Sequence, residues 1–186
     1  MFFQTIFTKF APLIPKNQYT KFWKYMIIDF TIKNYRSYKN ETTLTFEALD
    51  ESYKNDNYVE CAINDGTPIK LLKSMAIFGA NAAGKSNMIK ALGALSFDVN
   101  RRMPYYLPFL LDNESSNLPS CFSLRFIVND RAYLYEIQIN SYVHKETLSL
   151  LANEKSLPIY KRWGNDENDR NYNFYGEWES LKAKVD

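Results

Sequence analysis

Cysteine and histidine are nearly absent from this sequence. Its 186 residues contain two cysteines, Cys61 and Cys121, and one histidine, His144. The cysteines are isolated and lack the spacing of metal ligands, so we expect neither a zinc site nor a disulfide framework, but reduced thiols in a cytoplasmic protein. His144 lies in an apolar–polar alternation that favours a structural role, and no nucleophile-elbow motif accompanies it.

Long hydrophobic runs and an excess of one charge are missing as well. No segment reaches the roughly 18 apolar residues of a membrane span, so no membrane partner is expected. The formal net charge of +2 gives no electrostatic sign of a nucleic-acid partner. The tightest basic pair, Arg101 and Arg102, lies near the expected end of a helix, where cations favour the helix dipole. The length suits one domain with its own core.

One short stretch, IFGANAAGKSN (77–87), contains a recognisable chemical motif. It fits G-x-x-x-x-G-K-[ST], with Gly79, Gly84, Lys85 and Ser86 at the fixed positions. Residues 79–84, called the glycine loop below, allow successive N–H groups to point inward and bind an anion. The loop is expected to open a helix, whose unpaired first N–H groups favour phosphate. Lys85 is then expected to reach the β- and γ-phosphates of ATP, and Ser86 to hold Mg²⁺.

The residues around the glycine loop support this interpretation. Before it, the run LLKSMAIF (71–78) has the length and apolar character of a buried parallel strand. After it, apolar residues recur at helical spacing: Met88, Leu92, Leu95 and Val99, with Ile89 and Ala91 widening the same face. The pattern therefore predicts a strand, a phosphate-binding loop and a helix in that order.

The rest of the chain divides into a leader and one domain. Residues 1–25 are aromatic-rich, contain two prolines and show no regular period. We interpret them as a poorly ordered leader or as sequence upstream of the true start, with a membrane-surface helix as the alternative. Residues 26–186 form the domain. Alternation predicts antiparallel strand pairs at 27–35 with 43–48 and at 122–128 with 132–139, further strands at 143–150 and 158–163, and a short terminal helix.

The carboxylates that ATP hydrolysis requires are not evident. A neighbouring strand normally ends in a carboxylate that orients Mg²⁺, and a glutamate usually positions the attacking water. Asp112 and Glu114 follow an apolar run, but Pro108 interrupts it, and proline disfavours a central strand. Asp130 follows a strand and is accounted for by the hairpin turn. Only one strand–helix unit is visible, so half of the hydrolytic site is expected to be missing.

Two blocks of the sequence resemble a known group of proteins. The first block is IIDFTIKNYRSYKNETTLTFEA and the second is LLKSMAIFGANAAGKSNMIKAL. They are similar to the amino-terminal lobe of ABC-like AAA-type ATPases, which include RecF-like, SMC-like and OLD-like proteins. The greatest similarity is to the RloA-like ATP-binding proteins of bacterial restriction and abortive-infection loci. The region PFLLDNESSNLPSCFSLRFIVNDRAYLYEIQI extends the resemblance to about residues 26–163.

This resemblance implies an α/β fold, a P-loop NTPase lobe with an antiparallel β-subdomain. Asn81–Asn87 matches the phosphate-binding segment, with Ala82 and Ala83 in place of the more usual glycine and serine. Arg36 matches an arginine that approaches nucleotide in related proteins; the alternative is an exposed hairpin arginine. The resemblance also implies two ATP molecules sandwiched by a homodimer or a partner ATPase domain, with DNA or an effector nuclease as further partners. Because no Q-loop glutamine, signature motif or carboxylate strand is found, we expect an amino-terminal piece of a longer protein.

The leading functional hypothesis is ATP binding, with Mg²⁺, through the glycine loop and Lys85. In the complete protein, ATP hydrolysis would drive a conformational cycle in DNA-linked or phage-defence work. One alternative is a nucleotide-binding interaction module without turnover. Another is a phosphotransferase or GTPase, although the guanine-reading [NT]-K-x-D motif is absent from the sequence and antiparallel hairpins, rather than βα units, are expected after the helix.

Overall fold

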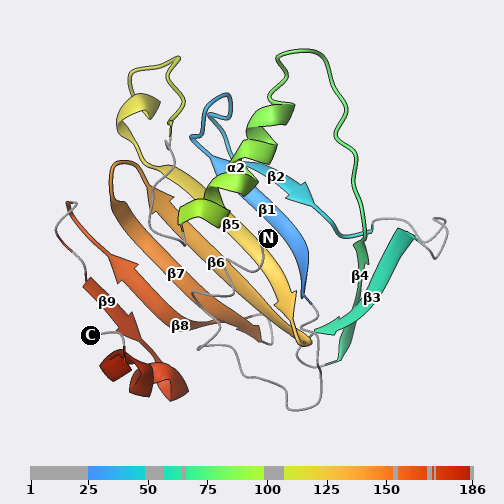
Figure 1. Ribbon diagram of the computed structural model, residues 1–186, viewed down its shortest axis with the longest axis vertical. Helices are drawn as coiled ribbons and strands as arrows, with labels where there is room; N and C mark the ends of the chain where they lie inside the picture. Colours follow the sequence, from blue (N-terminus) through green and yellow to red (C-terminus); the bar gives the residue numbers. More distant parts are fainter. Residues whose placement is uncertain are drawn as a thin grey trace.

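A computed structural model shows the arrangement of most of the chain (Figure 1). The structure describes residues 25–48, 57–63, 66–98, 107–152, 155–166, 169 and 171–184. Most of the expected leader, Val99 and the Arg101–Arg102 pair lie outside these ranges. The first strand begins at Tyr25, whose partner is Val128, two residues before the strand that alternation predicts from residue 27.

Seven antiparallel strands form the main sheet (Figure 1). In spatial order they are β2 (Thr42–Thr45), β1 (Tyr25–Lys33), β5 (Ser120–Val128), β6 (Arg131–Ile139), β7 (Val143–Ala152), β8 (Lys155–Trp163) and β9 (Asn171–Phe174). From β5 to β9, each strand pairs with the next one in the sequence. Such local hairpins follow from the period-2 alternation, which assigns one face of each strand to the core.

The expected hairpins are present. β1 pairs with β2, and β5 pairs with β6 from Ser120–Ile139 to Val128–Arg131. Asn129 and Asp130 form the turn between β5 and β6, and both have positive φ, at 48° and 64°. Asparagine and aspartate tolerate this conformation, which suits the twist of a two-residue hairpin. The short terminal helix is confirmed as the 3-10 helix η4 (Gly176–Lys184), whereas β9 was not anticipated.

The helix α2 (Lys85–Asp98) lies against one face of the sheet, over β1 and β5 (Figure 1). The buried residues of α2 are Met88, Ala91, Ala94 and Leu95. They belong to the same hydrophobic cluster as Phe30, Ile32, Phe122 and Leu124 of those strands. The helical spacing is therefore confirmed for this face. Ile89, however, is 58% exposed, so the apolar face does not widen in its direction as the pattern suggests.

The segment before the glycine loop differs from the prediction. The apolar run contributes only Leu71 and Leu72 to a strand, β4 (Thr67–Leu72), which pairs antiparallel with β3 (Tyr58–Ile63) in a separate two-stranded sheet. Residues 73–84 have no regular secondary structure, and Phe78 is 89% exposed. A parallel strand needs a neighbour for its backbone hydrogen bonds. The described residues place no strand beside 74–78.

The small sheet is attached to the large one near the end of β2. The Leu72 N–H donates to the Phe46 carbonyl at 2.8 Å, and the Ala48 N–H donates to the Lys70 carbonyl at 2.9 Å. A second, smaller hydrophobic cluster joins Cys61 and Leu71 of the small sheet to the large one. Both Cys61 and Cys121 are free thiols, as expected. The chain thus reaches the glycine loop from β4, at the edge of the main sheet.

Candidate nucleotide-binding site

The glycine loop leads directly into the first turn of α2. The Gly84 carbonyl accepts the N–H groups of Asn87 and Met88, at 2.8 and 3.2 Å, and so begins the hydrogen bonding of the helix. No acidic side chain lies in this first turn. The N–H groups at a helix start have no partner within the helix and lie at its positive dipole end. This geometry favours an anion, as the sequence predicts.

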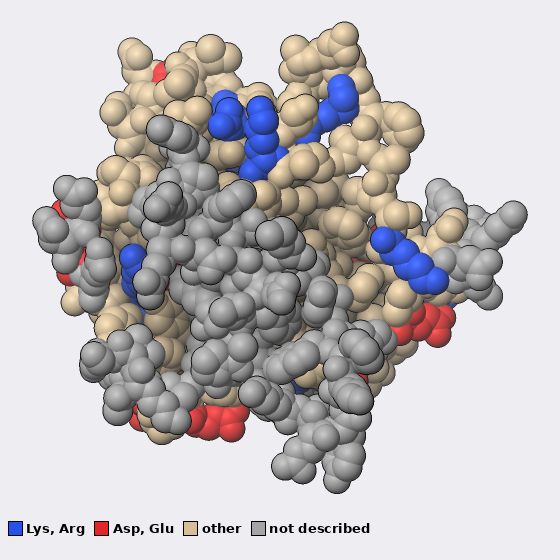
Figure 2. Space-filling model, viewed as in Figure 1, with Lys and Arg blue, Asp and Glu red and all other residues tan. Residues whose placement is uncertain are grey.

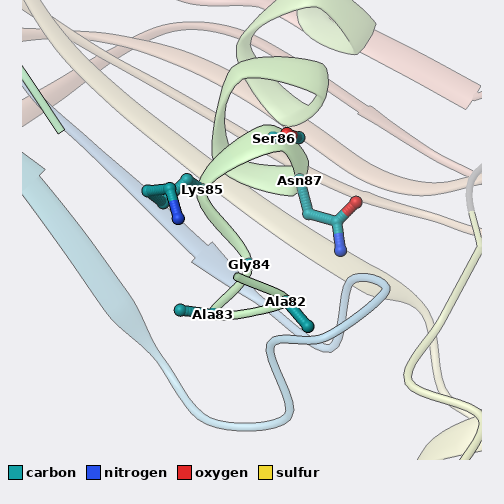
Figure 3. Close-up of a pocket in the computed structure, with 6 residues that line it drawn as sticks. All are labelled: Ala82, Ala83, Gly84, Lys85, Ser86 and Asn87. Carbon is teal, nitrogen blue, oxygen red and sulfur yellow. The ribbon is translucent and has the colours of Figure 1, made fainter. Parts of the chain in front are cut away.

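A cavity of about 150 Å³ lies at this helix start and is lined by six consecutive residues, Ala82, Ala83, Gly84, Lys85, Ser86 and Asn87 (Figure 3). All six were candidates from the sequence. Lys and Arg side chains gather at the same end of the molecule, where the β1–β2 turn and the start of α2 lie (compare Figures 1 and 2). The local charge therefore complements a polyanion, although the net charge of the chain is small.

The backbone of the glycine loop explains its residue choice at two positions. Gly84 has a φ of 90°, a conformation that side chains with a Cβ atom rarely adopt. A Cβ at this position would also lie 2.8 Å from the Ser37 Oγ and 3.1 Å from the Tyr38 Oη. Ala82 has a φ of 62°, where glycine would be the relaxed residue. The alanine that stands in place of the more usual glycine therefore has an unfavourable backbone conformation.

Lys85 crosses the glycine loop and binds its opposite side. Its Nζ donates to the Gly79 carbonyl at 2.7 Å and to the Ala80 carbonyl at 2.6 Å. These are charge-assisted hydrogen bonds, which are stronger than bonds between neutral groups. The lysine is therefore long enough to reach over the loop. An incoming phosphate would offer the ammonium group better acceptors than the two carbonyl oxygens.

Ser86 is exposed beside Lys85 (Figure 3). Within the described ranges, no group of three or more His, Cys, Asp or Glu side chains could hold a metal ion. Mg²⁺ commonly takes one or two protein oxygens and completes its shell with water and substrate phosphates. The Ser86 hydroxyl fits that role as a single ligand.

Of the three carboxylates that imitate a metal ligand in the sequence, Asp112 has a clear structural role. Asp112 pairs with Lys39 at 2.8 Å and accepts the Ser115 N–H at 2.6 Å. The hydrogen bond from Lys39 is the main reason that the pKa of Asp112 falls to about 2. Asp130 lies in the β5–β6 turn. Glu114 directly precedes the short 3-10 helix η3 (Ser115–Asn117).

Arg36 lies in the turn between β1 and β2, which passes close to the glycine loop. Its N–H donates to the Leu107 carbonyl at 2.8 Å, and its φ is 51°. Its Nε donates to the Tyr35 hydroxyl at 3.1 Å, and its guanidinium carbon lies 5.5 Å from the centre of the Tyr35 ring. The side chain is thus held on a tyrosine. Its predicted approach to nucleotide stays a prediction.

Two neighbours of Arg36 contact the glycine loop and α2, which spacing in the sequence could not reveal. The Asn87 Nδ2 donates to the Ser37 Oγ at 3.0 Å, and the Tyr38 hydroxyl donates to the Gly84 carbonyl at 3.2 Å. Figure 3 shows the Asn87 amide directed toward this turn. In the sequence, only the family resemblance connects the block KNYRSY (33–38) with nucleotide binding. That resemblance implies a role for Arg36 and none for Ser37 or Tyr38.

A second cavity, of about 370 Å³, opens beside Lys85 and Ser86. Its other lining residues are apolar: Leu44, Phe46, Met75, Ile77, Ile89 and Leu92. They come from the end of β2, from the irregular segment before the glycine loop and from the exposed side of α2. The site is therefore polar where the loop meets the helix and apolar toward the 74–78 segment.

A glycine-bounded loop that opens a helix, with a lysine able to cross it, defines a nucleotide-binding domain of the P-loop class. A family profile described as "AAA domain, putative AbiEii toxin, Type IV TA system" matches residues 74–185, more than half of the chain. The chain therefore belongs to this family of AAA-type P-loop domains. Neither a curated protein nor a solved structure matches it. The matched region begins just before the glycine loop and excludes β1 to β4.

Proposed function

We propose that this chain binds ATP with Mg²⁺ through residues 79–87. The observation that carries the proposal is the position of Lys85, whose ammonium group lies across the loop at 2.6–2.7 Å from two of its carbonyls. When phosphates bind, Lys85 exchanges these carbonyls for the β- and γ-phosphate oxygens. The backbone N–H groups of the glycine loop and of Lys85 and Ser86 would hold the phosphates, and the Ser86 hydroxyl would be the protein ligand of Mg²⁺.

The residues present fit a nucleotide better than they fit a hydrolytic centre. Bound Mg²⁺–ATP supplies a phosphoanhydride bond whose cleavage depends on positioning and charge stabilisation. The loop, Lys85 and Ser86 account for phosphate binding. No acidic cluster among the described residues accounts for orientation of the metal or of the attacking water. We therefore propose that this chain binds ATP and that hydrolysis takes place only in a larger assembly.

That assembly would be an ABC-like arrangement in which a homodimer or a partner ATPase domain completes the site. Its conformational cycle would serve DNA-linked or phage-defence work in the cytoplasm, with DNA or an effector nuclease as partner. The family description, which names a toxin of a type IV toxin–antitoxin system, favours the defence role. Among the described residues, no helix has the length and apolar character to cross a membrane.

Equilibrium titration with Mg²⁺–ATP tests the binding proposal. Lys85→Ala should weaken ATP binding at least tenfold, because a charge-assisted contact contributes about 1.5–3 kcal/mol. Lys90→Ala is the matched control, since Lys90 is an exposed lysine of the same helix. It should leave the affinity unchanged. Equal affinities of the parent chain and Lys85→Ala would overturn the assignment of the site.

A nucleotide-binding module without turnover is the second candidate, and the lack of an acidic cluster among the described residues favours it for the isolated chain. Phosphate release at high protein concentration separates the candidates, with Lys85→Ala subtracting contaminating activity. We expect no Lys85-dependent turnover. Steady turnover near 1 s⁻¹, roughly ordinary for an enzyme, would show that the missing carboxylate is present after all. Asp112 and Glu114 would then be the first residues to replace.

A further inference from the structure

The turn at residues 34–38 is joined to the phosphate site by two side-chain hydrogen bonds. The Tyr38 hydroxyl donates to the Gly84 carbonyl, and the Ser37 Oγ accepts from the Asn87 amide. The first bond reaches the last residue of the glycine loop, and the second reaches the first turn of α2. The close approach adds to the positive φ of Gly84 in disfavouring a side chain at position 84, because an added Cβ would lie 2.8 Å from the Ser37 Oγ.

The bond to Gly84 acts on the peptide unit that a phosphate would contact. The Gly84 carbonyl and the Lys85 N–H belong to the same trans peptide and therefore point in opposite directions. Tyr38 and two helix N–H groups hold the carbonyl on the helix side. The Lys85 N–H is consequently directed out of the helix start, where an anion binds. The hydrogen bond from Tyr38 to the Gly84 carbonyl thus helps to fix the direction of the Lys85 N–H, which would donate to phosphate.

The 34–38 turn has a rigid support of its own, independent of α2. Asn34 is 5% exposed and has a φ of 52°. Its Nδ2 donates to the carbonyls of Ser115 and Leu118, each at 2.9 Å, and its Oδ1 accepts the Phe109 N–H at 3.1 Å. The turn is therefore fastened to the 107–120 connection, so that Ser37 and Tyr38 project from a fixed base.

We propose that Ser37 and Tyr38 are positioning residues for the phosphate-binding loop. By holding Gly84 and Asn87 against the turn, they keep the loop and helix start in the arrangement that receives a triphosphate. This role rests on the proposed function, because it concerns the affinity of the same site. Neither residue lines the cavity at the start of α2. Their effect is carried by the direction of the Lys85 N–H and by the position of the first turn of α2.

Titrations with ATP and with inorganic triphosphate test this role. Tyr38→Phe and Ser37→Ala should each weaken both ligands about two- to tenfold, the factor expected for one neutral hydrogen bond. Equal losses for the two ligands are expected because the effect acts on the phosphates. Ser37→Thr keeps the hydroxyl and should restore affinity. Tyr142→Phe, a tyrosine at the β6–β7 turn, is the control and should bind as the parent does.

Two further measurements separate positioning from a general loss of structure. Without nucleotide, the melting temperatures of Tyr38→Phe and Ser37→Ala should fall by no more than about 2–4 °C, the effect of one lost hydrogen bond in a chain of this size. In addition, Ser37→Ala combined with Asn87→Ala should bind no more weakly than the weaker single variant, because both changes remove the same hydrogen bond.

The possible failures are distinguishable. If Lys85→Ala abolishes binding while Tyr38→Phe and Ser37→Ala keep the parental affinity, the positioning role is wrong and the proposed function stands. An affinity loss accompanied by a fall in melting temperature well beyond about 4 °C would also overturn the positioning role, because it would indicate a general loss of structure. If the parent chain binds neither ATP nor inorganic triphosphate, both proposals fall together.

Discussion

Two phenylalanines, Phe126 in β5 and Phe78 just before the glycine loop, lie in opposite environments. Phe126 is fully buried in the main core and stacks on Tyr133, with ring centres 5.6 Å apart. Phe78 is 89% exposed in a segment without regular structure. The main sheet is stabilised by side chains of its own strands and of α2. The segment before the loop, residues 73–78, has no fully buried side chain; its Lys73 N–H donates to the Asn57 carbonyl at 2.9 Å, and Ile77 packs at the margin of the main cluster.

This difference shows that the residues that stabilise the fold and the residues that form the candidate phosphate site lie in different parts of the domain. Phosphate sites need exposed N–H groups, which a packed core cannot offer. The glycine loop is therefore built at the edge of the fold, where α2 contributes its buried face to the core and its N-terminus to the site. The 34–38 turn contacts the loop and α2 through the Tyr38–Gly84 and Asn87–Ser37 hydrogen bonds.

The largest effect is expected from removal of the buried ring. Phe126→Ala should lower the free energy of unfolding by about 3–5 kcal/mol, because it removes apolar contacts and leaves a cavity in the sheet. Chemical denaturation measures the change. A loss below about 1 kcal/mol would mean that the sheet does not provide the main core, and the contrast with the loop segment would disappear.

An intermediate effect concerns Asp112, which fastens the 107–120 connection to Lys39. The pKa of Asp112 is lowered from 3.8 to about 2, first by the Lys39 hydrogen bond and then by the Ser115 N–H. Since the pKa is lower in the folded state, this stabilisation is present above the unfolded pKa near 3.8 and is lost as the pH falls through about 2.

Lys39→Ala should therefore raise the pKa of Asp112, although the Ser115 contact keeps part of the shift. The carboxyl carbon resonance of Asp112, followed by NMR from pH 1 to 6, measures this directly. Lys90→Ala serves as the control, because Lys90 lies on α2. An unchanged pKa in Lys39→Ala would show that the ion pair does not hold this connection in solution.

A smaller effect is expected at Ala82, whose φ of 62° is unfavourable for a residue with a Cβ. Ala82→Gly should stabilise the chain by up to about 1 kcal/mol, or about 2–4 °C in melting temperature for a chain of this size. Ala83→Gly is the matched control, because only Ala82 of the two has a positive φ. Stabilisation by Ala83→Gly and not by Ala82→Gly would contradict the backbone description of the loop.

The smallest effect is expected at Phe78. Phe78→Ala should change the free energy of unfolding by no more than about 0.5 kcal/mol, since an exposed ring has few contacts to lose. The same substitution at Phe126 makes the comparison direct. A loss of 2 kcal/mol or more at Phe78 would mean that the segment before the loop is packed, as the apolar run in the sequence predicts.

Much of the main sheet could be predicted from the sequence, because its strands pair mainly with their neighbours. The β5–β6 hairpin follows from alternation interrupted by Asn129 and Asp130, both of which accept the turn conformation. The motif likewise located the glycine loop, Lys85 and Ser86. In each case the determining residues lie close together in the chain.

The parts that were missed depend on distant residues. The run at 71–78 has the composition of a buried strand. A strand also needs a neighbouring strand for its backbone hydrogen bonds, and the composition of the run does not reveal whether one is present. Strand β3 is partly polar and gave only a weak pattern. The contact between Ser37 and Asn87 spans 50 positions, and the Asn34 contacts span more than 70. Hydrogen bonds of this kind leave no periodic signal in the sequence.

Amide hydrogen exchange with and without Mg²⁺–ATP is the most direct test of the central claim that the loop and the start of α2 bind the phosphates of a nucleotide. We expect added protection of the amides at residues 81–87 in the parent chain and in Lys90→Ala, and much less in Lys85→Ala at the same ATP concentration. Protection confined to β7–β9, or equal protection of 81–87 in Lys85→Ala, would contradict the claim.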